Sequence, residues 1–212
     1  MGWPRIVIGT SNRGKVREIS RLYADLPVEW VAMGDLGRPP ETAETGATFR
    51  ENARLKAEAV ARWSGLPALA EDSGLEVDAL GGAPGAYSAR FAGPDATDAE
   101  NVALLLRRLA GVPIERRTAR FRACAVLWWV DGCVDEADGA CEGRIASAPS
   151  GRSGFGYDPV FIPEGQSATF ADLGREVKDR LSHRARALEG LRPAIMRRVA
   201  AGPGDVGKMV GT

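Results

Sequence analysis

Residues 5–19 read RIVIGTSNRGKVREI, and this stretch decides how the fold begins. The short β-branched run over residues 5–9 is typical of a buried strand. Beyond Lys15, apolar residues recur at the spacing of one helix face as far as Pro27. The sequence therefore predicts a strand, a polar loop and a helix that Pro27 ends.

The loop between this strand and this helix carries small hydroxyl groups, a glycine and one cation. Lys15 stands at the start of the helix, where backbone N–H groups favour an anion. The spacing is not that of a Walker A motif. We therefore expect either a phosphate-binding loop or a turn in which Ser11 or Asn12 merely caps the helix.

Helical and extended patterns alternate through the rest of the chain. Capping-box patterns at residues 48–51 and 97–100 predict the starts of two helices. Asp131-Gly132 is a strong hairpin signal, so the long apolar segment before it should pair with the segment after it. The other predicted elements are extended segments at residues 29–33, 68–70 and 157–162, a long strand at residues 119–130 and a last helix capped by Ser182. The fold class is α/β with a mixed sheet.

Composition excludes several classes of function. The 28 basic residues balance 28 acidic ones, so no net field favours a nucleic acid polymer. Three cysteines without CxxC spacing are typical of reduced thiols rather than of a zinc site. No segment resembles a signal peptide or approaches about 20 consecutive apolar residues, so we expect a cytoplasmic protein that avoids membranes.

The acidic pair Glu71-Asp72 directly follows the predicted strand at residues 68–70. Such a pair is often a solvated turn. In an open α/β sheet, however, ligands gather beyond the carboxyl ends of strands, and carboxylates there suit Mg²⁺. A carboxylate that is not a ligand could deprotonate an attacking water. Glu44, in a polar segment, could be a further ligand, although acids are common in loops.

Two further segments carry candidate binding residues. Residues 154–159, GFGYDP, place aromatic rings between glycines, which suits either base stacking or an ordinary core contact at a turn. Lys178 and the pair His183-Arg184, which contains the only histidine of the sequence, would by themselves be a helix face or a cap.

Six stretches in order resemble the inosine-triphosphatase type of nucleoside triphosphate pyrophosphatases, over roughly residues 5–195. They are residues 10–15, 48–53, 71–75, 81–90 (Gly81 to Gly85 with Tyr87 to Arg90), 154–159 and 182–184. The resemblance implies an elongated mixed sheet flanked by helices, with two lobes and a nucleotide cleft between them. It also implies a homodimer that hydrolyses a purine nucleoside triphosphate to the monophosphate and pyrophosphate with Mg²⁺. We expect a single two-lobed domain over residues 1–200 and a flexible tail over residues 201–212.

The resemblance also implies roles for individual residues. Asp72 matches the metal-binding proton acceptor, Glu44 a less certain metal ligand, and Glu71 is left as an auxiliary ligand, because many bacterial members carry aspartate there. The matched substrate contacts are Thr10, Ser11, Asn12, Arg13, Gly14, Lys15, Ser73, Phe155, Gly156, Tyr157, Asp158, Lys178, His183 and Arg184. In this hypothesis the cations pair with the triphosphate, and the 155–158 turn with His183-Arg184 selects a 6-oxopurine over adenine.

Three other functions remain open at this point. A related pyrophosphatase acting on modified pyrimidines, dTTP or UTP would share the phosphate chemistry and differ at the base. A regulatory module could bind triphosphates without hydrolysing them, although such a sensor gains little from paired acids beside Lys15. An RNA-binding protein is disfavoured by the neutral charge balance.

Overall fold

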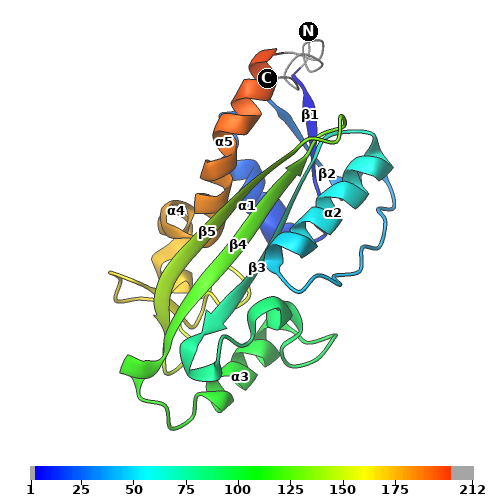
Figure 1. Ribbon diagram of the computed structural model, residues 1–212. Helices are drawn as coiled ribbons and strands as arrows, with labels where there is room; N and C mark the ends of the chain where they lie inside the picture. Colours follow the sequence, from blue (N-terminus) through cyan, green and yellow to red (C-terminus); the bar gives the residue numbers. More distant parts are fainter. Residues whose placement is uncertain (1–2, 202–212) are drawn as a thin grey trace, which may run out of the picture. The chain divides into compact units, whose positions relative to one another are not determined.

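The computed structural model describes residues 3–201 and has the predicted α/β architecture (Figure 1). Six strands of this part of the chain form one mixed sheet in the order β2-β1-β3-β4-β5-β6. β1 is parallel to β2 and β3, whereas β5 and β6 are antiparallel. The strands are β1 (Arg5–Ile8), β2 (Glu29–Ala32), β3 (Ala68–Val77), β4 (Thr118–Trp128), β5 (Val134–Ile145) and β6 (Phe161–Pro163).

Five α-helices and four short 3₁₀ segments accompany these strands within residues 3–201. The helices are α1 (Arg13–Leu22), α2 (Phe49–Ser64), α3 (Asp98–Arg108), α4 (Phe170–Leu181) and α5 (His183–Ala201). The 3₁₀ segments are η1 (Met33–Leu36), η2 (Asp78–Leu80), η3 (Gly85–Arg90) and η4 (Ile114–Arg116). None of the helices in this range combines the length and the apolar character that crossing a bilayer requires.

The described chain divides into two compact units, each with its own apolar core. The first unit contains the residues up to Asp72, residues 124–137 and the residues from Ala187 onward. The second contains residues 73–123 and 138–186. The first unit packs α2 with alanine and valine side chains of neighbouring strands, whereas the core of the second unit holds larger aliphatic and aromatic side chains. The predicted tail at residues 201–212 lies, beyond Ala201, outside the described residues.

The first strand and helix form as predicted, but the helix ends early. Asn12 caps α1, because its side chain accepts hydrogen bonds from the backbone N–H groups of Gly14 and Lys15. The helix ends at Leu22, so the prediction that Pro27 ends it is wrong. Tyr23 and Leu26 lie beyond the helix yet are buried, which is why their apolar spacing extended the helical pattern.

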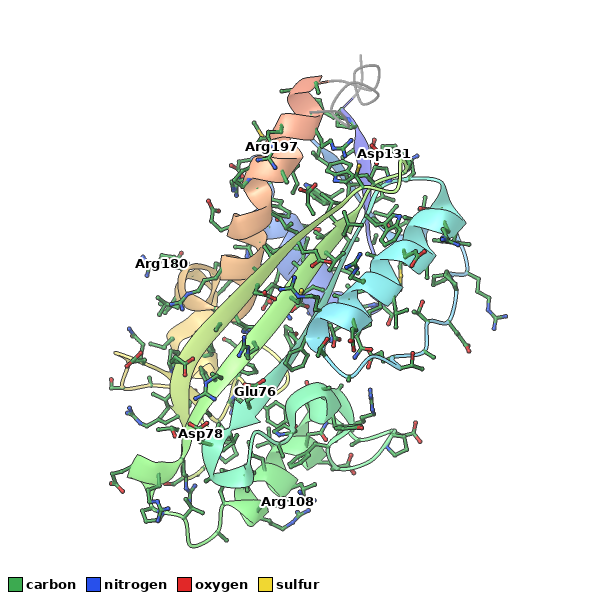
Figure 2. The ribbon with its side chains drawn as sticks, viewed as in Figure 1. Glu76, Asp78, Arg108, Asp131, Arg180 and Arg197 are labelled. Carbon is green, nitrogen blue, oxygen red and sulfur yellow. The ribbon has the colours of Figure 1, made fainter. Side chains whose placement is uncertain are left out.

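The predicted strand at residues 68–70 is the beginning of a much longer one. β3 runs through the acidic pair and past Glu76 to Val77, and Asp78 starts η2 (Figure 2). The interpretation of Glu71-Asp72 as lying beyond the strand end is therefore wrong. Both side chains are buried inside the strand, where lysines from two helices neutralise them. Polar residues in this segment obscured its extended character.

Local signals set the other elements with two exceptions. Both capping boxes are present, Ser182 accepts from the Ala185 N–H at the start of α5, and Gly132 turns the β4–β5 hairpin with a positive φ. The predicted strand at residues 157–162 is wrong for residues 157–160, which form turns, because the extended part is β6. Helix α4 was not predicted, although Thr169 caps it by accepting from Asp172 N–H.

All three cysteines are free thiols, as expected.

Candidate active site

The loop after β1 is both a helix cap and the carrier of a cation. Thr10 Oγ1 accepts from the Asn12 N–H at 3.2 Å, and Asn12 caps α1, so the loop is built by its own side chains. The Lys15 ammonium lies 2.8 Å from a carboxylate oxygen of Glu71 on β3. Ser11 and Arg13 are exposed and Gly14 is buried. The capping interpretation is therefore confirmed, and the start of the helix carries an ammonium group that pairs with Glu71.

Asp72 lies in a cluster of two carboxylates around one ammonium group. The Lys56 nitrogen is 2.6 Å from Asp72 Oδ1 and 2.6 Å from Glu44 Oε1. Burial alone would lower the pKa of Lys56, but the two carboxylates outweigh it and raise the pKa above its ordinary value. Lys56 therefore stays charged and holds both acids together. Asn52 Nδ2 lies 3.5 Å from the other oxygen of Asp72.

The loop that carries Glu44 is fastened to the first turn of α2. The Gly46 N–H donates to Asn52 Oδ1 at 2.8 Å, and the Ala47 N–H donates to Glu51 Oε2 at 2.6 Å. A side chain at Gly46 would overlap Glu51 and Asn52, so glycine is needed for this close approach. Asn52 thereby orients both the loop and Asp72.

Glu44 and Asp72 fit the requirements of a divalent cation. Their oxygens on Lys56 can be no farther apart than twice the 2.6 Å contact. Mg²⁺ binds oxygens at about 2.1 Å and commonly takes only one or two carboxylates, the rest being water and phosphate oxygens. Within residues 3–201 no group of three or more His, Cys, Asp or Glu side chains gathers as a metal site. The protein would thus supply a carboxylate pair.

Glu71 does not join this pair. Successive side chains of a strand point to opposite faces, and Glu71 pairs with Lys15 from α1 whereas Asp72 pairs with Lys56 from α2. This geometry disfavours the prediction that Glu71 is an auxiliary metal ligand and gives it the role of anchoring Lys15.

Sequence reasoning missed Lys56 and Asn52. Both lie on α2, four residues apart and therefore on one helix face, and Asn52 is buried. An asparagine followed one turn later by a lysine, just after a capping box, is the sequence signal that could have indicated a polar site on this face. The sequence pattern indicates no partner for either residue, because Asp72 is reached only through the packing of α2 on β3.

The predicted residues of the second unit gather around the ring of Phe155. The Lys178 ammonium lies 4.4 Å and the Arg184 guanidinium 5.5 Å from the ring centroid, so two cations contact one aromatic side chain. Lys178 also pairs with Asp158 Oδ2 at 2.5 Å. Arg184 donates to Ser73 Oγ at 3.2 Å. Five predicted contacts thus form one cluster: Ser73, Phe155, Asp158, Lys178 and Arg184.

The turn that presents Phe155 depends on glycine. Gly154 has φ +83°, and a side chain there would overlap the Asp158 carboxylate. That carboxylate accepts from the Phe155 N–H at 2.9 Å, and the Gly156 N–H donates to Asp98 Oδ2 at 2.7 Å. These two backbone donors of the turn are therefore both engaged by carboxylates within the protein.

Two predicted contacts serve the core as well. The His183 ring stacks on Phe121 with centroids 4.6 Å apart. The Tyr157 hydroxyl donates to the Ser88 carbonyl at 2.9 Å in a buried setting, and burial raises its pKa. Both side chains are buried, which agrees with the simpler interpretation of Tyr157 as an aromatic core contact. His183 is neither a cap nor a surface residue, because Ser182 caps α5 and the ring lies in the core.

Comparison with known proteins places this arrangement among relatives. Residues 6–194 match the Ham1 family. A Geobacillus kaustophilus protein named dITP/XTP pyrophosphatase is 53% identical over 189 residues, which cover 88% of this chain and 91% of that protein. A Shigella flexneri protein of the same name is 47% identical, over 90% of this chain and 98% of that protein.

Solved structures agree with the sequence relatives. A HAM1 protein from Coxiella burnetii aligns with a TM-score of 0.83 and 38% identity, over 92% of this chain and all of that chain. A nucleoside-triphosphatase, or dITP/XTP pyrophosphatase, from Mycobacterium abscessus aligns with a TM-score of 0.72 and 43% identity, over 89% of this chain and 99% of that chain. The similarity therefore extends across both units.

Proposed function

The chain belongs to the Ham1 family, and we propose that it hydrolyses non-standard purine nucleoside triphosphates, dITP and XTP among them, to the monophosphate and pyrophosphate. The observation that carries this proposal is the Asp72–Lys56–Glu44 cluster, in which Asp72 is buried, in a chain 53% identical to a protein named dITP/XTP pyrophosphatase. A nucleotide-pool enzyme of this kind removes deaminated purines before they are used in synthesis.

The first unit carries the proposed phosphate chemistry. Water attacks the α-phosphorus, Asp72 accepts the proton of that water, and the bond to the oxygen that bridges to the β-phosphorus breaks. Pyrophosphate leaves with the electron pair of that bond. Lys15 at the start of α1 offsets its charge, and the backbone of the loop over residues 10–15 orients the phosphates. Glu71 keeps the Lys15 ammonium in place.

The proposed cofactor is Mg²⁺, for which Asp72 and Glu44 are the ligands. When bound, it would neutralise phosphate charge and polarise the reacting phosphoryl group. Lys56 holds the two carboxylates close together, which keeps the pair organised before substrate arrives.

The second unit carries the proposed base recognition. Phe155 offers an aromatic face, and Lys178 and Arg184 place positive charge beside it. Hypoxanthine and xanthine present a 6-oxo acceptor, which hydrogen-bond donors favour, whereas adenine presents a 6-amino donor. Leaving buried donors unpaired costs about 1–3 kcal/mol per group, or roughly 5- to 150-fold in selectivity.

A homodimer and a cytoplasmic location remain parts of this proposal, as does the absence of nucleic acid and membrane partners. The even balance of 28 basic and 28 acidic residues supports the exclusion of a nucleic acid polymer.

Pyrophosphate release tests the function. The chain is assayed with dITP, XTP, dATP, dGTP, dTTP and UTP, with Mg²⁺ and with EDTA. We expect dITP and XTP to exceed dATP in kcat/KM by at least about fivefold, and EDTA to abolish release. Asp72→Asn should lower kcat by at least about 100-fold. Asp35→Asn, an exposed acid of the same unit, is the matched control and should keep full activity.

Other outcomes would select the alternatives. A preference for dTTP or UTP would make the chain a pyrimidine-type pyrophosphatase. Nucleotide binding by calorimetry without release from any triphosphate would make it a sensor. Normal turnover of Asp72→Asn would remove Asp72 from the proposed mechanism.

A further inference from the structure

We propose that Asp98 is a positioning residue that fixes the turn over residues 154–158 in the conformation used for base recognition. This inference rests on the proposed function only through the role given to that turn. Asp98 is the first residue of α3, and no sequence pattern connected it with the candidate site.

The contact itself joins two segments that are far apart in the sequence. The Gly156 N–H donates to Asp98 Oδ2 at 2.7 Å, across 58 residues. A backbone donor on a carboxylate makes a charge-assisted hydrogen bond, which is shorter and stronger than a neutral one. Both residues belong to the second unit, so the contact is internal to one compact body.

The turn needs such an anchor because its backbone is intrinsically free. Gly154 and Gly156 flank Phe155, and both have positive φ, +83° and +60°. Glycine reaches these values and many others without a steric penalty, so the unfolded and alternative states of the segment are numerous. A hydrogen bond at Gly156 removes freedom at the residue next to the proposed stacking ring.

Asp98 is itself held firmly enough to act as an anchor. It follows Thr97, whose hydroxyl accepts from the Glu100 N–H while Glu100 accepts from the Thr97 N–H at 2.7 Å. One turn further, the buried Asn101 accepts from the Ala92 N–H and thereby ties α3 to the chain that follows η3. The start of α3 is thus fixed before the turn contacts it.

A second tether brings the turn to the same segment. The Tyr157 hydroxyl donates to the Ser88 carbonyl in η3 at 2.9 Å. Ser88 Oγ accepts from the Leu75 N–H on β3, two residues after Ser73. The negative charge of Asp98 adds to burial in raising the pKa of Tyr157, which agrees with its place beside the turn. Gly156 is therefore held by α3 and the next residue, Tyr157, by η3.

Amide hydrogen exchange tests the anchor without any substrate. In Asp98→Ala, peptides covering residues 154–158 should exchange at least about fivefold faster, because the Gly156 N–H loses its acceptor. Asp98→Asn keeps an acceptor oxygen and should exchange like the wild type. Asp95→Ala removes an exposed carboxylate from the segment just before α3 and is the matched control, with no expected change.

Steady-state kinetics with dITP test the consequence for recognition. Asp98→Ala should raise KM about three- to tenfold with little change in kcat, because the phosphate chemistry belongs to other residues. Asp98→Asn should restore KM to within twofold of the wild type. If Asp98 acted only through its negative charge at the start of α3, Asp98→Ala and Asp98→Asn would raise KM equally.

The outcomes separate the two proposals. Unchanged exchange of residues 154–158 in Asp98→Ala overturns the positioning role, whatever the activity. Faster exchange with an unchanged KM overturns its link to recognition. If the wild type releases no pyrophosphate from dITP, the proposed function fails, and the exchange experiment still decides whether Asp98 anchors the turn.

Discussion

Replacing Lys56 by methionine should destabilise the protein through the carboxylates that it leaves behind. Asp72 and Glu44 share the Lys56 ammonium at 2.6 Å each, and the side chains are 18% exposed for Lys56, 9% for Asp72 and 30% for Glu44. Breaking a fully buried pair costs about 3–5 kcal/mol. Partial exposure screens these charges, so we expect a loss of about 2 kcal/mol, or about 4–8 °C in Tm for a chain of this size.

The assay is urea denaturation in EDTA, combined with a double-mutant cycle. Asp72→Asn removes the charge that Lys56 neutralises, so Lys56→Met should cost less in that background, with a coupling energy of about 1.5 kcal/mol. Arg62→Met, on the same helix, breaks an exposed pair with Glu58 and should cost no more than about 0.5 kcal/mol. Costs that simply add, within about 0.5 kcal/mol, would refute the argument that Lys56 stabilises Asp72.

Two further predictions concern the second unit. Gly154→Ala combines a positive φ with an overlap on Asp158 and should destabilise by more than about 2 kcal/mol, whereas Gly156→Ala, with open space, should cost about 1 kcal/mol; equal urea midpoints would contradict this. Thr118 and then Arg120 lower the pKa of Asp78, labelled in Figure 2, below its ordinary value of 3.8. The ionised Asp78 therefore stabilises the protein above pH 3.8, and this stabilisation is lost as the pH falls through the lowered pKa. The difference of about 0.5 kcal/mol in unfolding free energy between the wild type and Asp78→Asn should be seen at pH 6 and close near pH 2. A difference that widens in acid would refute this expectation.

Local chemistry made much of the fold predictable. The cap at Asn12, the box at residues 48–51 and the turn at Asp131-Gly132 each depend on atoms within about four residues, so neighbouring letters suffice to predict them. The candidate site was predicted mainly through the family resemblance, and the membership it implied is confirmed. The length of β3 was not predicted, because Glu71 and Asp72 look like solvated residues until the lysines that neutralise them are in place.

The sequence by itself determined most of the types of element, the glycines that the turns need and the chemical groups proposed for phosphate and metal. Only the tertiary structure decided which groups meet: Lys56 reaches Asp72 across 16 residues and Asp98 reaches Gly156 across 58. The physical reason is that a buried charge or a free backbone donor is stabilised by whichever partner the packing of helices on strands brings within about 3 Å. That partner is fixed by long-range packing, which leaves no period or spacing in the chain.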